Sequence, residues 1–267
     1  MNNNRRNFIK NIGLMGASGI LIPSIALGNV QAKEQTNYNN KVRPKVLFFD
    51  VNETLLDLTN MKKQVGEALG GREDLLALWF TTMLQYSLVT TAGGQYDQFG
   101  NIGAAALQMV AANNGISISQ EEARNTVLNS LRGLPAHPEV KEALTQLKND
   151  GYKLVSFTNS SNEGVKKQFE SAGLTEYFDE RLSVEDVGKF KPFTDTYSWA
   201  ARKMGVKPEE CMLIAAHGWD VAGAMWAGWR AAFISRPGQQ LFPLAPIPEI
   251  NEKDLIKISE KLIALKN

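Results

Sequence analysis

Short apolar runs, each bounded by polar residues, recur along the chain from residue 45 onward. A run of four or five apolar residues suits a strand that is covered on both faces, as in a parallel sheet. Strands are predicted at Val46–Phe49, Lys153–Phe157, Met212–Ala215 and Ala231–Ile234.

Helical patterns separate these runs, and a glycine follows each of three such patterns. A glycine directly after the last periodic apolar residue is a typical helix stop. Alternating strands and helices predict a Rossmann-like α/β core, in which a parallel sheet carries helices on both sides. The helices are predicted at Glu139–Asp150, Glu163–Ala172 and Thr194–Met204.

Residues 60–135 break this alternation, because they contain helical patterns and no convincing strand. We expect an all-helical cap inserted after the first strand, with residues 44–59 and 136–267 forming the core. Ligands of open α/β sheets bind outside the carboxyl ends of the strands, so the cap should cover that edge. The helical patterns of the cap include Asp74–Val89, Gln98–Asn113 and Gln120–Leu131.

Polar residues follow three of the predicted strands. Asp50 comes directly after the first run, Thr158 and Asn159 end the second, and His217–Asp220 follows the third. Because the carboxyl ends of parallel strands meet at one edge of a sheet, we expect these side chains to converge on one site.

Composition narrows the possible partners. The 267 residues include 29 Lys and Arg against 28 Asp and Glu, a net charge of +1, which gives no electrostatic case for nucleic acid or an anionic membrane. One cysteine, Cys211, rules out an internal disulfide, and two histidines are too few for a His-rich zinc site. Of these histidines, we interpret His137 as a hinge residue where the chain returns from the cap to the core.

The first 32 residues have the features of an export signal. The pair Arg5-Arg6 resembles the twin-arginine consensus, an apolar stretch spans Ile12 to Leu27, and a small-residue cleavage site ends at Ala32. The apolar stretch is only slightly shorter than a membrane span, so an uncleaved membrane anchor is the alternative. We predict a signal at 1–32, a linker at 33–43, and a periplasmic protein with no stable membrane contact after cleavage.

Four short motifs occur in the order found in the haloacid dehalogenase superfamily. Asp50 alone is a weak signal, since an aspartate there could be a nucleophile, a metal ligand, a base or a helix cap. With Thr158-Asn159, Lys191-Pro192 and His217-Gly218-Trp219-Asp220, however, the chain resembles that superfamily over about residues 44–237. Tyr197 and the Trp-Asp pair make it similar to the type II L-2-haloacid dehalogenase branch rather than to the phosphatases.

The resemblance implies a role for each motif residue. Asp50 would displace halide from the α-carbon of a short (S)-2-haloacid, and water would hydrolyse the resulting aspartyl ester to a 2-hydroxyacid. Lys191 would orient Asp50, with Lys189 as a less favoured rival. No cofactor is implied, and a homodimer through cap helices is the expected assembly. Thr54 would hydrogen-bond Asp50, Tyr197 and Asp220 would position the lysine, and the substrate would contact Asn52, Thr158, Asn159, Tyr197 and Trp219.

Position 52 bears on the class of reaction. Phosphatases of the superfamily carry there a second aspartate that protonates the leaving oxygen, and Asn52 cannot act as an acid. Halide leaves without a proton, and only Asp220 stands where the phosphatases have paired metal carboxylates. The sequence therefore favours a metal-independent dehalogenase. A phosphatase, or a non-catalytic protein on the same scaffold, is the alternative.

Several positions depart from the pattern of the branch. Phe80 stands where an arginine holds the departing halide, which leaves an aromatic edge or Trp79 to contact it. Ala215 replaces a serine. His217 replaces an asparagine and Glu53 a small residue, so we predict a dyad in which Glu53 orients His217 as general base for the hydrolytic water. The alternative is that His217 hydrogen-bonds backbone and Glu53 caps a helix.

Overall fold

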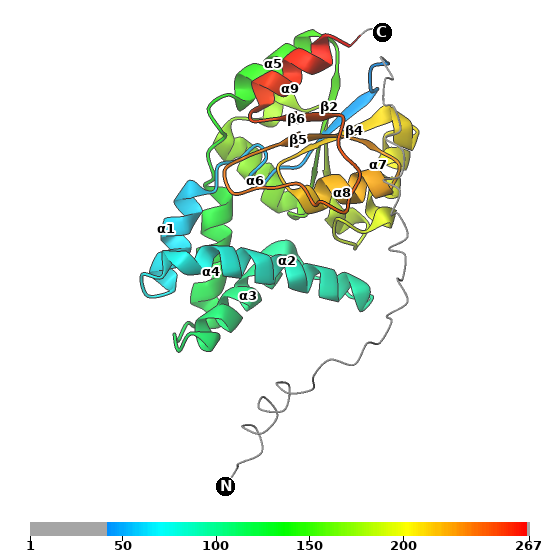
Figure 1. Cartoon of the computed structure of the whole chain (residues 1–267). Coiled ribbons are helices and arrows are strands. Elements are labelled where there is room, and N and C mark those ends of the chain that lie inside the picture. The colour runs from blue at the N-terminus through cyan, green and yellow to red at the C-terminus, as the bar shows by residue number, and fades with distance from the viewer. Residues whose placement is uncertain (1–41, 266–267) are drawn as a thin grey trace, which may run out of the picture. The chain divides into compact units, whose positions relative to one another are not determined.

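A computed structural model describes residues 42–265 of the chain (Figure 1). Residues 1–41 and 266–267 lie outside this part, and with them the predicted signal, its cleavage site and almost all of the linker. The described residues comprise a sheet-containing core and a helical cap.

Six parallel strands in the described part form one sheet, in the order β3-β2-β1-β4-β5-β6. This sheet confirms the predicted α/β fold class. The apolar pattern does not predict β3 and β6, because they are short edge strands in which exposed polar residues interrupt the run. The strands are β1 (Val46–Phe49), β2 (Lys153–Thr158), β3 (Glu180–Ser183), β4 (Cys211–Ala215), β5 (Arg230–Ile234) and β6 (Ile250–Glu252).

Helices cover both faces of the sheet. Figure 1 shows α5 (Val140–Asn149) and α9 (Leu255–Ile263) packed together on one face, with α7 (Thr194–Lys203) and α8 (Gly218–Trp226) on the opposite face. The remaining core helix, α6 (Asn162–Ala172), contacts the edge strand β3. The central strands β1 and β4 are therefore fully enclosed, as their apolar runs predict.

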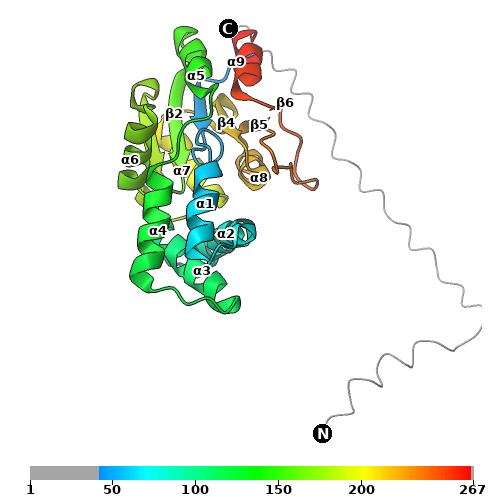
Figure 2. The same cartoon turned by 90° about the vertical axis from the view of Figure 1, so that its left-hand side faces the viewer.

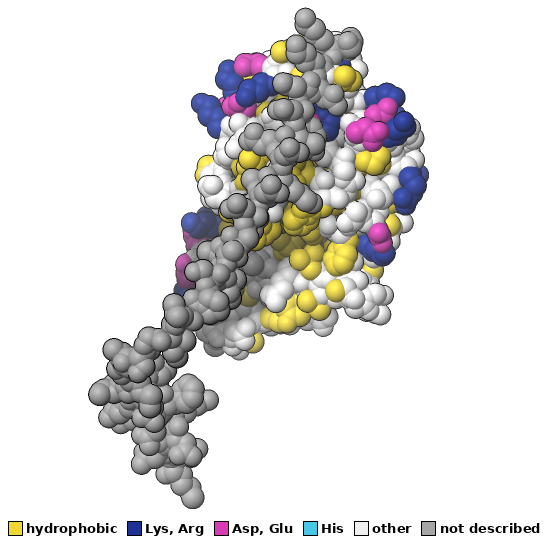
Figure 3. Space-filling model, turned by 45° about the vertical axis from the view of Figure 1, so that its right-hand side comes forward, with side chains coloured by type: hydrophobic (Ala, Val, Ile, Leu, Met, Phe, Trp, Pro, Cys, Tyr) yellow, Lys and Arg dark blue, Asp and Glu magenta, His cyan; other side chains and the backbone are white. Residues whose placement is uncertain are grey.

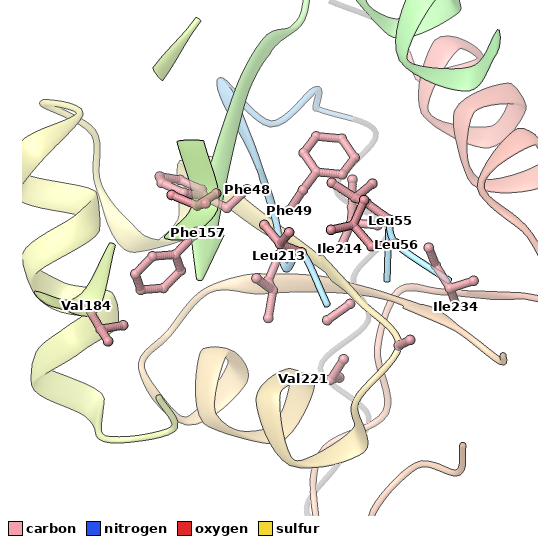
Figure 4. Close-up of a cluster of buried hydrophobic side chains, with 14 of the residues drawn as sticks. Phe48, Phe49, Leu55, Leu56, Phe157, Val184, Leu213, Ile214, Val221 and Ile234 are labelled. Atoms are coloured by element: carbon pink, nitrogen blue, oxygen red, sulfur yellow. The ribbon is translucent and has the colours of Figure 1, made fainter. Parts of the chain in front are cut away.

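Aromatic and aliphatic side chains of the central strands form the core under the site (Figure 4). Phe48 of β1 contacts Phe157 of β2 edge to face, with ring centroids 6.2 Å apart, and Trp229 with centroids 4.4 Å apart. Burying each such ring stabilises the fold by roughly 1.5–3 kcal/mol. The strand ends are thereby held in a rigid frame.

Four helices form the cap between β1 and α5, and no strand lies among them. They are α1 (Thr59–Ala68), α2 (Leu76–Ala92), α3 (Phe99–Asn113) and α4 (Gln120–Arg132). Figure 2 shows α1 and α4 side by side, leading from the core to the crossing pair α2 and α3. The indole of the buried Trp79 donates a hydrogen bond to the Gly103 carbonyl at 2.8 Å, which ties α2 to α3.

Helix α2 carries no charged residue. With the turn before it, Glu73–Ala92, it is long and apolar enough to cross a membrane by length and composition. Here it packs against α3 through one face that buries Trp79 and Met83, while its other residues, including Leu78 and Val89, are exposed or partly exposed. On the face shown in Figure 3, the lower part of the molecule presents mainly hydrophobic and uncharged side chains.

The cap is bonded to the core beside the carboxyl ends of the strands. The Thr91 hydroxyl at the end of α2 accepts a hydrogen bond from the Phe190 amide at 3.1 Å, and Gln168 of α6 donates to the Leu131 carbonyl of α4 at 3.1 Å. Phe190 lies in the segment after β3, and Gln168 lies on α6, which follows β2. The cap therefore covers the carboxyl edge of the sheet.

Candidate active site

Three neighbouring strands bring the predicted motif residues together. Strand β1 lies between β2 and β4, and Phe49 pairs in register with Ser156 on one side and Ile214 on the other. Asp50 is the next residue after β1, so it emerges at the centre of the carboxyl edge. The chain after β2 and the first turn of α8 flank it on either side.

Lys191 lies at the centre of a buried ionic cluster. Its ammonium group donates to Asp50 Oδ1 at 3.0 Å, to Asp220 Oδ2 at 2.5 Å and to the Phe157 carbonyl at 2.9 Å. The side chain is 0% exposed, and a fully desolvated ammonium is stable only where such partners surround it. The rival Lys189 instead pairs with Asp195 at the surface, so the structure places Lys191 at Asp50.

A second layer of contacts holds Asp220. The Tyr197 hydroxyl donates to Asp220 Oδ1 at 2.5 Å, and Tyr197 is itself fully buried. Gly223 allows this packing, because a Cβ there would lie 2.7 Å from the Tyr197 hydroxyl and 2.5 Å from Pro192 Cβ. Tyr197 therefore supports Asp220 and does not face a substrate, which corrects its predicted place among the substrate-binding residues.

The second oxygen of Asp50 receives two further groups. Thr54 donates to Asp50 Oδ2 at 2.7 Å while its own oxygen accepts from the Ala216 amide at 2.9 Å. His217 Nδ1 lies 3.2 Å from the same Oδ2. Both Asp50 oxygens are thus oriented by groups from three different segments of the chain.

His217 and Glu53 are paired as the sequence predicts. His217 Nε2 lies 2.9 Å from Glu53 Oε2, and the imidazole thereby bridges Asp50 and Glu53. Glu53 has φ of 64°, in the left-handed region that a non-glycine residue rarely adopts. Such strain persists only where the surroundings over-determine it, and it is typical of functional sites.

Aromatic rings flank the imidazole. Trp219 stacks on His217 with ring centroids 5.2 Å apart, and Phe80 of the cap stacks with centroids 6.1 Å apart. Phe80 is thus at the site, where it contacts His217. Trp79 is wrongly placed there by the sequence, since it is fully buried within the cap with its N–H bonded to Gly103.

The side chains expected to bind substrate carry structural hydrogen bonds as well. Asn52 accepts from Gln168 at 2.8 Å and donates to the Ser160 hydroxyl at 3.3 Å. The Asn159 side-chain oxygen accepts from the Lys191 amide at 3.0 Å, and Thr158 accepts from the Ser160 amide at 3.1 Å. These bonds fix the loop beside Asp50.

Sequence reasoning missed three polar residues that these contacts bring in. Ser160 directly follows the second motif, so its position was a usable signal. Gln168 lies on α6 and Gln239 on the loop after β5, where no motif marks them, although Gln239 donates to Glu53 Oε2 at 2.9 Å. No sequence motif indicates, either, that the Nε2 of His137 donates to the Glu53 carbonyl at 2.9 Å, a contact that is compatible with the predicted hinge position of this residue.

Opposite charges set the ionisation of the site. Burial alone would raise the pKa of Asp50, but the Lys191 ammonium and the bonds from His217 and Thr54 hold that pKa well below its usual range. Burial alone would lower the pKa of His217, but its hydrogen bonds to Asp50 and Glu53 raise the pKa to about 9. At neutral pH the resting site therefore holds an imidazolium between two carboxylates.

The chemistry available to this cluster is nucleophilic. Asp50 is an ionised carboxylate at the end of a rigid strand, beside groups that can move a proton. Within residues 42–265 there is no group of three or more His, Cys, Asp or Glu side chains that could hold a metal ion. Lys191 occupies one carboxylate oxygen of Asp50, and His217 and Thr54 contact the other.

The raised pKa of His217 makes stability depend on pH. The group contributes its full stabilisation below its unfolded pKa of 6.5 and loses it as the pH rises through about 9. The difference in unfolding free energy between the wild type and His217→Asn should therefore shrink by about 3 kcal/mol between pH 6 and pH 10. Urea denaturation at both pH values measures it; an unchanged difference would mean that folding does not raise the pKa of His217.

Several curated proteins similar to this chain are named as dehalogenases. It is 28% identical over 204 residues to (S)-2-haloacid dehalogenase 1 of Pseudomonas sp. (strain CBS-3), covering 76% of this chain and 89% of that one. It is 26% identical over 206 residues to haloacetate dehalogenase H-2 of Moraxella sp. (strain B), covering 77% and 92% respectively. The similarity thus extends over almost the whole length of these relatives.

A solved structure has the same fold. L-2-haloacid dehalogenase from Xanthobacter autotrophicus superposes with a TM-score of 0.76 at 22% identity, covering 81% of this chain and 97% of that one. The family model for haloacid dehalogenase-like hydrolases matches residues 44–228, the segment that carries all four motifs. The protein therefore belongs to the haloacid dehalogenase-like hydrolases.

Proposed function

We propose that this protein is an (S)-2-haloacid dehalogenase that hydrolyses the carbon–halogen bond of short 2-haloalkanoic acids. The observation that carries the proposal is Asp50, an ionised carboxylate at the end of β1 with Lys191 on one oxygen and Thr54 on the other. The relatives named (S)-2-haloacid dehalogenase and haloacetate dehalogenase support the substrate class.

The first step needs a nucleophile and no acid. An Asp50 oxygen attacks the α-carbon, the new carbon–oxygen bond forms, and halide leaves with the bonding electron pair. Lys191 holds the carboxylate in line and offsets its charge. Asn52, which stands where a leaving oxygen would need an acid, is bonded to Gln168 and Ser160 and has no proton to give. This favours halide over a phosphate ester.

The second step needs a base, and ester formation creates one. The ester carries no negative charge, so one of the two carboxylates that raise the pKa of His217 is lost and the imidazolium releases its proton to solvent. This is the one proton that the overall reaction sets free. Neutral His217, held by Glu53, then takes a proton from the water that attacks the ester carbonyl.

Collapse of this intermediate restores the resting site. The ester bond to the substrate oxygen breaks, and the alkoxide of the 2-hydroxyacid takes from His217 the proton that His217 removed from the water. Asp50 returns as a carboxylate, and the second proton of the attacking water restores the His217 imidazolium. Lys191 remains charged throughout, because the ordinary pKa of a lysine is far above neutral and Asp220, whose charge raises that pKa, stays beside it when Asp50 is esterified.

Halide release tests the proposed reaction. The 33–267 protein should release bromide from bromoacetate with EDTA present, because no step above requires a metal. Asp50→Asn should lower the rate at least 10³-fold, since an amide is a very poor nucleophile. Ion chromatography of bromide measures both. Absence of release from the wild type would contradict the proposal and leave a phosphatase, tested with magnesium, or a binding protein.

The role of His217 predicts a trapped intermediate. In His217→Ala, ester formation should continue while its breakdown slows by roughly 10²–10⁴-fold, the contribution of a positioned base. Alanine is used because asparagine would restore the residue expected from the resemblance. Mass spectrometry after mixing with bromoacetate should then show the carboxymethyl ester on Asp50. The double variant with Asp50→Asn is the control and should show no adduct. Full turnover by His217→Ala would argue against the dyad.

We also propose that residues 1–32 export the protein to the periplasm. The support is the Arg5-Arg6 pair followed by an apolar stretch. Replacing both arginines by lysine keeps the charge and removes the twin-arginine feature, so it should retain the precursor in the cytoplasm. Fractionation of expressing cells measures this; a precursor that pelleted with membranes in the wild type would point instead to an anchor.

A further inference from the structure

The loop between β5 and β6 lies directly against the proposed base. It leaves β5 after Ile234, passes through Arg236 and Gln239, and packs on the first turn of α8. A Cβ at Gly218 would lie only 2.2 Å from the Gln240 carbonyl oxygen and 3.1 Å from Leu241 Cα. Gly218 is the residue after His217, so the loop has a fixed position relative to the imidazole.

Gln239 reaches from this loop to Glu53. Its side-chain amide donates to Glu53 Oε2 at 2.9 Å, and this is the same oxygen that lies 2.9 Å from His217 Nε2. One carboxylate oxygen therefore serves two donors. Gln239 is half-buried, and its neighbour Gln240 is exposed.

The backbone around Glu53 is held by the same part of the molecule. His137 donates to the Glu53 carbonyl, and Arg236 donates to the Thr54 carbonyl at 2.9 Å. These contacts surround the residue whose φ is 64°. Of the groups that hold Glu53, Gln239 acts on the carboxylate itself, whereas His137 acts on the backbone.

We propose that Gln239 is a positioning residue. It holds the Glu53 carboxylate against His217 and weakens the hold of that carboxylate on the imidazolium proton. The proposal rests on the proposed dehalogenase reaction and deepens it. A donor on Oε2 restricts the rotation of the Glu53 carboxylate, and it also draws negative charge away from the oxygen that His217 uses. Gln239 would thus help the imidazolium to release its proton once the ester forms.

The charged groups that face the pair come from every segment packed around it. Because Gln239 is uncharged, its replacement by leucine removes a hydrogen bond without changing the net charge around the Glu53–His217 pair. The groups are Asp50 after β1, Lys191 before α7, His137 before α5, and Arg236 after β5, which pairs with Glu139 at 2.7 Å.

The test compares Gln239→Leu with Gln240→Leu, the same substitution at the exposed neighbour. Rapid mixing with bromoacetate, followed by mass spectrometry, gives the rates of ester formation and ester breakdown separately. We expect Gln239→Leu to form the ester within about twofold of the wild-type rate and to break it down about tenfold more slowly. The pH midpoint of breakdown should rise by about half a unit, because Oε2 then holds the imidazolium proton more tightly. Gln240→Leu should match the wild type.

A second variant keeps the length of the side chain but adds negative charge beside Glu53, where Gln239 donates a hydrogen bond. Gln239→Glu places a second carboxylate beside Glu53, so the midpoint should rise further than in Gln239→Leu. A purely structural role of the loop would change ester formation and breakdown together, or thermal stability alone, and would leave the midpoint in place.

Three results would overturn the inference. One is that Gln239→Leu breaks the ester down at the wild-type rate. Another is that the rates of ester formation and ester breakdown fall equally while the pH midpoint of breakdown stays unchanged. The third is the absence of halide release from the wild type, which removes the proposed function and this inference with it. Dehalogenation by the wild type with unaffected Gln239 variants would remove only the role of Gln239.

Discussion

The rest of the site depends on the ion pairs that the buried ammonium group of Lys191 forms with Asp50 and Asp220. A cation without exposed surface needs opposite charge on more than one side, and here Asp50 and Asp220 supply it. Removing the lysine would leave two buried carboxylates facing one another. The surrounding packing follows from this requirement: Tyr197 fixes Asp220, and Gly223 lets α8 approach closely enough for the contact to form.

The second cation of the site has a different function. Lys191 and His217 both contact Asp50, but a lysine has an ordinary pKa well above neutral and keeps Asp220 beside it, whereas the ordinary pKa of a histidine lies near neutrality. In the proposed reaction Asp50 is both the nucleophile and one of the groups that keep the imidazole protonated. Ester formation there would consume the carboxylate and at the same time prepare the base for the next step.

The sequence predicts the central strands and the residues at their ends, but it predicts neither the edge strands nor the contacts that loops bring to the site. Central strands such as β1 and β4 are recognisable because both faces are buried, which requires an unbroken apolar run. The edge strands β3 and β6 bury less and leave no such run. At the site, residues adjacent to strand ends, such as Asp50, were predictable from position. Gln239 and the hydrogen bond of His137 were not, because they depend on how a loop and a cap hinge fold back, and no local periodicity encodes that.

The stacking of Phe80 on His217 has a consequence for the side chain that position 80 can carry. The ring centroids lie 6.1 Å apart, so a guanidinium group at position 80 would lie close to the imidazolium, and like charges at short range repel. An apolar ring avoids that repulsion. Phe80 is therefore compatible with a protonated His217, whereas an arginine in its place would favour the neutral imidazole.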